Sequence, residues 1–119
     1  MAEALKEARK ALKYDEVPIG CVIVKDGKIL SRAFNRKVTR QDATCHAEIE
    51  AIRKAEKKQG NWYLDECDLY VTLEPCLMCT GAIIQSRIRK VVFATRDPKG
   101  GAFYSNLRIE DVRGLNHYP

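Results

Sequence analysis

The order of strand-like and helix-like segments limits the fold of this chain more than any other feature of its sequence. Residues 68–73 (DLYVTL) and 90–95 (KVVFAT) are short apolar runs rich in β-branched side chains, typical of strands covered on both faces. Between them, Pro75 predicts a helix over residues 76–86, because the first helical turn does not use the N–H group that proline lacks. Strands separated by a helix favour an α/β architecture.

The N-terminal third predicts a helix followed by a hairpin. Leu5, Ala8 and Leu12 recur at helical spacing, so we expect an amphipathic helix that ends before Val17-Pro18. The apolar runs GCVIV and KILSRAF then flank Lys25-Asp26-Gly27, and Asp-Gly is typical of tight hairpin turns. The chain therefore begins with a helix and two antiparallel strands.

A second helix is expected to begin between Asp42 and Thr44, which are both capping residue types, and to continue through Ile49, Ile52 and Ala55. The predicted order is αββαβαβ, without internal repeats or linkers. Helices between the strands favour a three-layer α/β/α sandwich around a central sheet.

Length, charge and cysteine content narrow the function. The 119 residues suit one domain, and no apolar run of about 18 residues or secretory signal is visible, so we expect a cytoplasmic protein without a membrane span. Five cysteines are an odd number, which argues against a disulfide framework and for metal binding or catalysis. The net charge of +5 suits a polyanionic partner without requiring one.

The motif PCLMC places Cys76 and Cys79 about one helical turn apart, so that both sulfurs lie on nearly the same face. Unpaired amides at the start of the helix and the helix dipole favour their thiolate forms. The motif alone is compatible with a redox pair, with half of a structural zinc site, or with two buried cysteines of no chemical role.

Among the remaining metal-binding side chains, His46 is the natural third ligand. Cys21 and Cys67 are predicted to be buried strand residues, and His117 lies near the end of the chain. Glu48 is two residues from His46, about 200° further around a helix, so the two side chains share a target only beyond the helix end. A catalytic zinc keeps one position for water, which suits Glu48 beside the metal; a capping role is the alternative.

The patterns His46-Ala47-Glu48 and P-C-x-x-C together resemble the zinc-dependent nucleobase deaminases. Further segments resemble bacterial tRNA-specific adenosine deaminases in order and spacing: VPIGCVIVKDGKI, FNR, HAEIEAI, LYVTLEPCLMCTGAIIQSRI, KVVF, RDPKGGA and LNH. The resemblance extends from Val17 to His117 and implies a cytidine deaminase-like α/β/α sandwich with a mixed sheet.

The resemblance also implies the chemistry. One zinc ion per chain would be held by His46, Cys76 and Cys79, with water as the fourth ligand. Glu48 would move protons between that water, the ring nitrogen next to C6 of adenine and the leaving amine, so that adenosine becomes inosine. Further family positions imply contacts with the substrate: Asn35, Val17, Pro18, Asp97 and Lys99.

The implied partner is the anticodon loop of a tRNA, with adenosine converted at the wobble position by a homodimer. Several arginines are additional candidates for phosphate contacts: Arg36, Arg40, Arg87, Arg89 and Arg96. One alternative is a deaminase of a free base or nucleotide, such as guanine, cytosine or deoxycytidylate. Another is a structural zinc module that binds RNA without turnover, although such a module has no use for Glu48.

The chain departs from the family pattern at four places. Ala43 replaces a usual proline, and Cys45 replaces a usual alanine beside His46, where we expect the thiol to be a bystander. The residues Phe103-Tyr104-Ser105 replace smaller ones in a loop near the RNA. We expect residues 1–119 to form one deaminase domain without the C-terminal strand and helix that cover the anticodon loop in the family.

Overall fold

A computed structural model describes all 119 residues and confirms the predicted order of helices and strands. A short 3-10 helix near the end is the only addition to the αββαβαβ pattern. No helix combines the length and apolar character needed to cross a membrane. The elements are α1 (Ala2–Leu12), β1 (Gly20–Lys25), β2 (Lys28–Phe34), α2 (Ala47–Gln59), β3 (Cys67–Leu73), α3 (Leu77–Gln85), β4 (Lys90–Thr95) and η1 (Ile109–Asp111).

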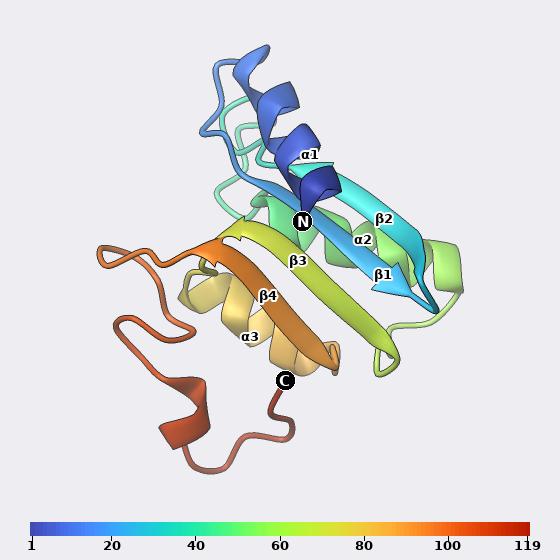
Figure 1. The fold of residues 1–119 in the computed structure, drawn as a ribbon, viewed down its shortest axis with the longest axis vertical. Coiled ribbons are helices and arrows are strands. Elements are labelled where there is room, and N and C mark those ends of the chain that lie inside the picture. The colour runs from blue at the N-terminus through green and yellow to red at the C-terminus, as the bar shows by residue number, and fades with distance from the viewer.

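The strands form one mixed sheet in the order β2-β1-β3-β4. β1 is antiparallel to both neighbours, whereas β3 and β4 are parallel because α3 carries the chain back between them. Asp26 and Gly27 both have positive φ, in agreement with the predicted hairpin turn. The carboxyl ends of β3 and β4 therefore meet at one edge of the sheet (Figure 1).

Helices cover both faces of the sheet, which confirms the three-layer α/β/α sandwich. Figure 1 shows α1 in front of β1 and β2, with α2 and α3 behind the sheet. The main core cluster joins Ile23, Leu69 and Val71 of the sheet to Ala51 and Ile83 of the helices. Burial of each large aliphatic side chain stabilises the fold by roughly 1.5–3 kcal/mol.

The buried face of α1 agrees with the predicted one at Ala8 but not at the two leucines. Leu5 and Leu12 are exposed, and the helix contacts the sheet through alanines instead. At Gly20, a Cβ atom would lie 2.0 Å from the carbonyl oxygen of Ala4 and 2.4 Å from the backbone nitrogen of Ala8. The backbones of α1 and β1 approach so closely that only small residues fit, and this closeness overrides the leucine spacing.

The second helix begins at Ala47 and not between Asp42 and Thr44, so that prediction was wrong. The Asp42 carboxylate accepts hydrogen bonds from the N–H and hydroxyl groups of Thr44 at 2.8 and 2.7 Å, which closes a turn in place of a helix cap. His46 has an extended backbone (φ −75°, ψ 156°) and is the N-cap residue of α2. The shift places His46 at the helix end.

The remaining corrections concern α3 and β4. α3 begins at Leu77, so Cys76 is its N-cap residue and Pro75 precedes the cap. β3 is the buried interior strand that its composition predicted, but β4 is an edge strand whose residues are partly or fully exposed. The apolar run of β4 correctly predicted a strand, but the interior position that it predicted in the sheet was wrong.

Candidate metal centre and active site

The N-termini of α2 and α3 bring the three predicted metal ligands together. His46 and Cys76 are the N-cap residues of these helices, and Cys79 follows in the first turn of α3. His46 Nδ1 lies 3.6 Å from Cys76 Sγ and 3.5 Å from Cys79 Sγ, and the three ligand atoms lie within 4.8 Å of one another. The cluster lies at the N-terminal ends of both helices, where side chains from the two helices can bind one ion.

This set of donors fits one zinc ion per chain. Thiolate sulfur and imidazole nitrogen are ligands that zinc prefers, and the cluster contains no fourth histidine, cysteine or carboxylate. Three protein ligands leave one tetrahedral position for water or substrate, as in catalytic rather than structural zinc sites.

The two thiols of the cluster have different proton affinities. A hydrogen bond from Cys79 lowers the pKa of Cys76 to about 5. The same interaction and burial raise the pKa of Cys79. One sulfur is therefore a thiolate at neutral pH, and a cation bound to both sulfurs displaces the second proton.

Glu48 lies beside this cluster, in the first turn of α2, and is buried. Burial raises the pKa of Glu48 to about 7. The carboxyl group lines a hollow of about 110 Å³ but does not belong to the group of ligand atoms. This hollow is lined by Ile19, His46, Glu48, Leu73, Glu74, Cys76 and Asp97.

The hollow at the cluster is not the largest on the molecule. A hollow of about 560 Å³ lies over α2 and α3, beside the exposed Trp62, and contains none of the predicted metal ligands. Chemistry rather than size therefore identifies the candidate active site.

Glu74 is a residue of this site that sequence reasoning missed. Its carboxylate accepts hydrogen bonds from the backbone N–H groups of Asp97, Phe103, Tyr104 and Ser105, at 3.1, 3.2, 2.8 and 2.8 Å, and from the Ser105 hydroxyl. One buried anion thus holds both ends of the loop that follows β4. The only trace in the sequence is an acidic residue between a strand and Pro75.

The predicted substrate residues Val17, Pro18 and Asn35 do not line the hollow themselves but adjoin Ile19, which does. The buried Asn35 donates from Nδ2 to the Val17 carbonyl oxygen at 3.4 Å, and its backbone N–H donates to Ile19, a lining residue, at 3.0 Å. Val17 and Pro18 are exposed. Asn35 therefore holds the backbone of the Val17 loop at two carbonyl oxygens.

Asp97 also lines the hollow, and Lys99 is exposed. The Asp97 carboxylate accepts hydrogen bonds from the N–H groups of Lys99 and Gly100, both at 3.1 Å. Asp97 thus shapes the turn that presents Lys99 to solvent.

The five candidate arginines have different surroundings. Arg89 pairs with Asp68 through two hydrogen bonds at 3.0 and 3.1 Å, and Arg40 pairs with Glu50. Arg87 donates to a backbone carbonyl oxygen. Only Arg36 and Arg96 place their guanidinium groups over aromatic rings.

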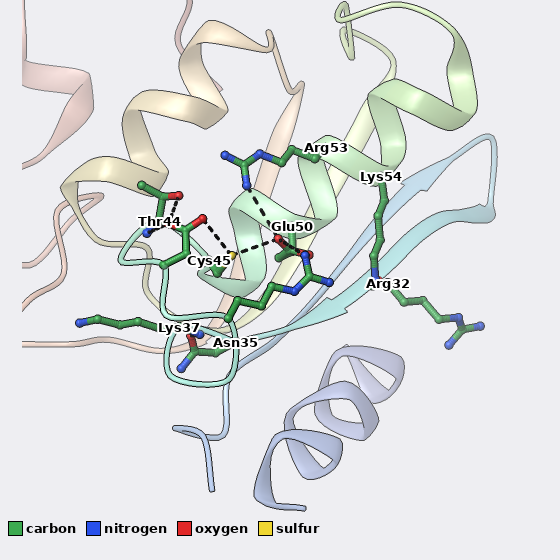
Figure 2. Close-up of polar contacts among 10 residues, drawn as sticks. Arg32, Asn35, Lys37, Thr44, Cys45, Glu50, Arg53 and Lys54 are labelled. Atoms are coloured by element: carbon green, nitrogen blue, oxygen red, sulfur yellow. Dashed lines mark hydrogen bonds and ion pairs between the residues drawn. The ribbon is translucent and has the colours of Figure 1, made fainter. Parts of the chain in front are cut away.

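Cys45 lies next to His46 in sequence, but its thiol does not belong to the group of ligand atoms. Its sulfur lies 3.4 Å from a carboxylate oxygen of Asp42 and 3.4 Å from one of Glu50, so its single proton can be donated to either, and Arg53 Nη1 lies 3.8 Å from the same Glu50 oxygen (Figure 2). Burial and these carboxylates raise the pKa of Cys45 to about 11. Cys21 and Cys67 are buried in β1 and β3, as predicted.

Comparison with known proteins agrees with this geometry. Residues 1–95 match the family described as the cytidine and deoxycytidylate deaminase zinc-binding region. The chain therefore belongs to this family of zinc-binding deaminases. Among its relatives, the tRNA-specific adenosine deaminase of Aquifex aeolicus is 47% identical over 96% of this chain and 76% of its own length, and that of Bacillus subtilis is 48% identical over 98% and 73%.

Solved structures show the same relationship. A structure from a study of A-to-I editing by tRNA:A34 deaminases is 48% identical and matches all of this chain and 92% of its own, with a TM-score of 0.96. The guanine deaminase of Bacillus subtilis is 43% identical over 80% of this chain and 61% of its own, with a TM-score of 0.77.

Proposed function

We propose that residues 1–119 form a single deaminase domain that converts adenosine to inosine at the wobble position of a tRNA anticodon. The observation that carries this proposal is the buried Glu48 carboxyl, which lines the same hollow as His46 and Cys76 without joining the ligand group. A structural zinc site has no use for such a carboxyl group, whereas hydrolytic deamination requires a group that moves protons. The tRNA-specific relatives support adenosine in tRNA as the substrate.

In this proposal, His46, Cys76 and Cys79 would hold zinc, which when bound would supply Lewis-acid activation of water for attack on C6 of adenine. Glu48 accepts a proton from the attacking water and delivers it to the neighbouring ring nitrogen. The same carboxyl group would then take the remaining proton from the new hydroxyl group on C6 and pass it to the amino group, which leaves as ammonia when the C6–N bond breaks and the carbonyl of inosine forms. Burial of Glu48 keeps bulk water away from these transfers.

The residues around the hollow would position the target nucleotide. Asn35 would hydrogen-bond the base, beside Val17 and Pro18, while Asp97 and Lys99 would meet the ribose and the RNA backbone. Support comes from the burial of Asn35 and from the hydrogen bonds that fix the Asp97 turn.

We further propose a cytoplasmic homodimer that binds the anticodon loop. A second copy of the chain would cover the hollow over α2 and α3 and bury Trp62, whose side chain is 56% exposed. Sedimentation equilibrium should give twice the mass of 13.5 kDa, and Trp62→Ala should shift the protein towards the monomer. A monomeric native chain at micromolar concentration would contradict the dimer.

Deamination of a free base is the second candidate, because the solved guanine deaminase shares the fold and is 43% identical to this chain over the matched region. The decisive assay offers the purified protein an anticodon stem-loop with adenosine at the wobble position, and separately free guanine and cytidine. Inosine in the stem-loop alone is expected. Ammonia from a free base, without inosine in the stem-loop, would replace the tRNA proposal.

A further inference from the structure

Tyr104 carries two arginines on its ring. The guanidinium carbons of Arg96 and Arg108 lie 4.2 and 4.3 Å from the ring centroid, within the range of cation–π attraction. Arg108 also donates a hydrogen bond from Nη2 to the Tyr104 hydroxyl at 2.9 Å. We call these three residues the arginine–tyrosine cluster.

The positive charge of this cluster is poorly neutralised by the protein itself. The one ion pair that either arginine makes is with Glu110, whose Oε1 lies 4.0 Å from Arg108 Nη1, at the limit of an ion pair. Both partners are exposed, so the attraction is screened and contributes little. Two cations therefore share one ring at the surface, which is an arrangement that favours a bound anion.

The cluster is rigidly connected to the wall of the active-site hollow. The Tyr104 N–H donates to one oxygen of Glu74, and the Asp97 N–H, next to Arg96, donates to the other. Phe103 packs edge-on against Phe93 of β4, with 6.1 Å between the ring centroids. The arginines are thus held beside the place where we propose the target nucleotide to bind.

From this placement we propose that Arg96 and Arg108, held by Tyr104, bind phosphodiester groups of the RNA strand adjoining the target nucleotide. The inference rests on the proposed function, since it needs a nucleotide in the hollow. A guanidinium group that stacks on a ring keeps its N–H donors at the edge, where they match the oxygens of a phosphate. Tyr104 orders both side chains before binding, which reduces the entropy cost of RNA binding.

The test measures RNA binding and turnover separately. Dissociation constants for the anticodon stem-loop are measured between 50 and 300 mM salt in the Glu48→Gln background, and kcat and KM for inosine formation are measured with Glu48 intact. The variants are Tyr104→Ala and Arg108→Gln, with Tyr104→Phe as the conservative change. Arg9→Gln, an exposed arginine on α1, removes one charge elsewhere and is the matched control.

Both variants should raise Kd and KM several-fold beyond Arg9→Gln and leave kcat unchanged, because the arginines would hold the phosphate equally in ground and transition states. The slope of log Kd against log salt should fall by about 0.7 for each phosphate that the variant no longer binds. Tyr104→Phe should retain most of the affinity. Arg108 is exposed, so Arg108→Gln tests the proposal even where Tyr104→Ala disturbs folding.

The inference is overturned if Tyr104→Ala and Arg108→Gln match Arg9→Gln in Kd and salt slope, or if they lower kcat without weakening binding. Its failure is distinct from failure of the proposed function. A protein that forms inosine normally while the variants have no effect lacks the phosphate site only. A protein that forms no inosine, but whose RNA binding depends on Tyr104, retains the phosphate site and has another activity.

Discussion

Two buried glutamates line the same hollow, and their hydrogen-bond partners give them opposite properties. Burial raises the pKa of Glu48 to about 7. Burial acts in the same direction on Glu74, but hydrogen bonds from Ser105, Tyr104 and Asp97 outweigh it and lower the pKa of Glu74 to about 2. One carboxyl group can exchange protons near neutral pH, while the other is a permanent anion that holds a loop.

The difference teaches that burial alone does not define a catalytic carboxyl group. Glu48 and Glu74 are 4% and 2% exposed, so accessibility does not separate them. The two groups are separated by the number of N–H donors that converge on each carboxylate. Every donor stabilises the ionised form and occupies an oxygen lone pair that could otherwise accept a proton. We therefore expect substitutions at the two sites to fail in different ways.

The largest effect is expected from Glu48→Gln. Glutamine fills the same space but cannot accept and return a proton, so kcat should fall by about 10²–10⁴-fold. Zinc content, measured by atomic emission, and thermal stability should stay close to those of the native protein. A variant that binds zinc and keeps full activity would remove Glu48 from the mechanism.

Glu74→Gln should act on the loop rather than on the proton transfers. In the native protein the N–H donors of the loop meet carboxylate oxygens, whereas in the variant some of them would face the amide NH₂ group. The free energy of unfolding should therefore fall by about 2–4 kcal/mol. With the loop displaced, KM for RNA should rise more than kcat falls. Denaturant unfolding and steady-state kinetics measure both; a pure loss of kcat with native stability would make Glu74 equivalent to Glu48.

Gly101→Ala reaches the same loop without changing any charge. A Cβ atom there would lie 2.5 Å from Glu74 Cδ and 2.6 Å from the Asp97 carbonyl oxygen, so the carboxylate or the loop must move. We expect a loss of stability of about 1–3 kcal/mol and a smaller rise in KM than for Glu74→Gln. Gly100→Ala is the matched control, since its Cβ would only touch Asp97 Oδ2, at 3.4 Å. Equal effects of Gly101→Ala and Gly100→Ala would show that the contact between residue 101 and Glu74 does not determine the geometry of the loop.

The sequence predicted much of the fold because strands, turn residues and caps leave local patterns. The hairpin at Asp26-Gly27 and the strands of residues 28–34 and 90–95 were found with their observed bounds. The buried face of α1 was predicted only in part because it depends on the close approach of Gly20, a contact that helix periodicity does not contain. The edge position of β4 is likewise decided by pairing and not by composition.

The residues of the site also divide into those that local sequence patterns predict and those that depend on contacts distant in sequence. His46, Cys76 and Cys79 could be selected because ligand types and spacing are local, and the helix ends bring them together. Glu74 could not, since its donors lie between Asp97 and Ser105, more than twenty residues further along the chain. The contact between Tyr104, Arg96 and Arg108 was also invisible, because it depends on the course of a loop.

The smallest effect is expected from substitution of Cys45. This residue is a third buried group, next in sequence to the metal ligand His46, and it extends the comparison of Glu48 with Glu74. Its thiol can donate its single proton to Asp42 or to Glu50, and each carboxylate has another donor, from Thr44 and Arg40 respectively. Cys45→Ala should therefore change stability by about 1 kcal/mol or less and leave zinc content and kcat unchanged. Cys79→Ser is the control, since it should lower zinc content sharply. Loss of zinc in Cys45→Ala would show that this thiol, and not only its neighbour His46, belongs to the metal centre.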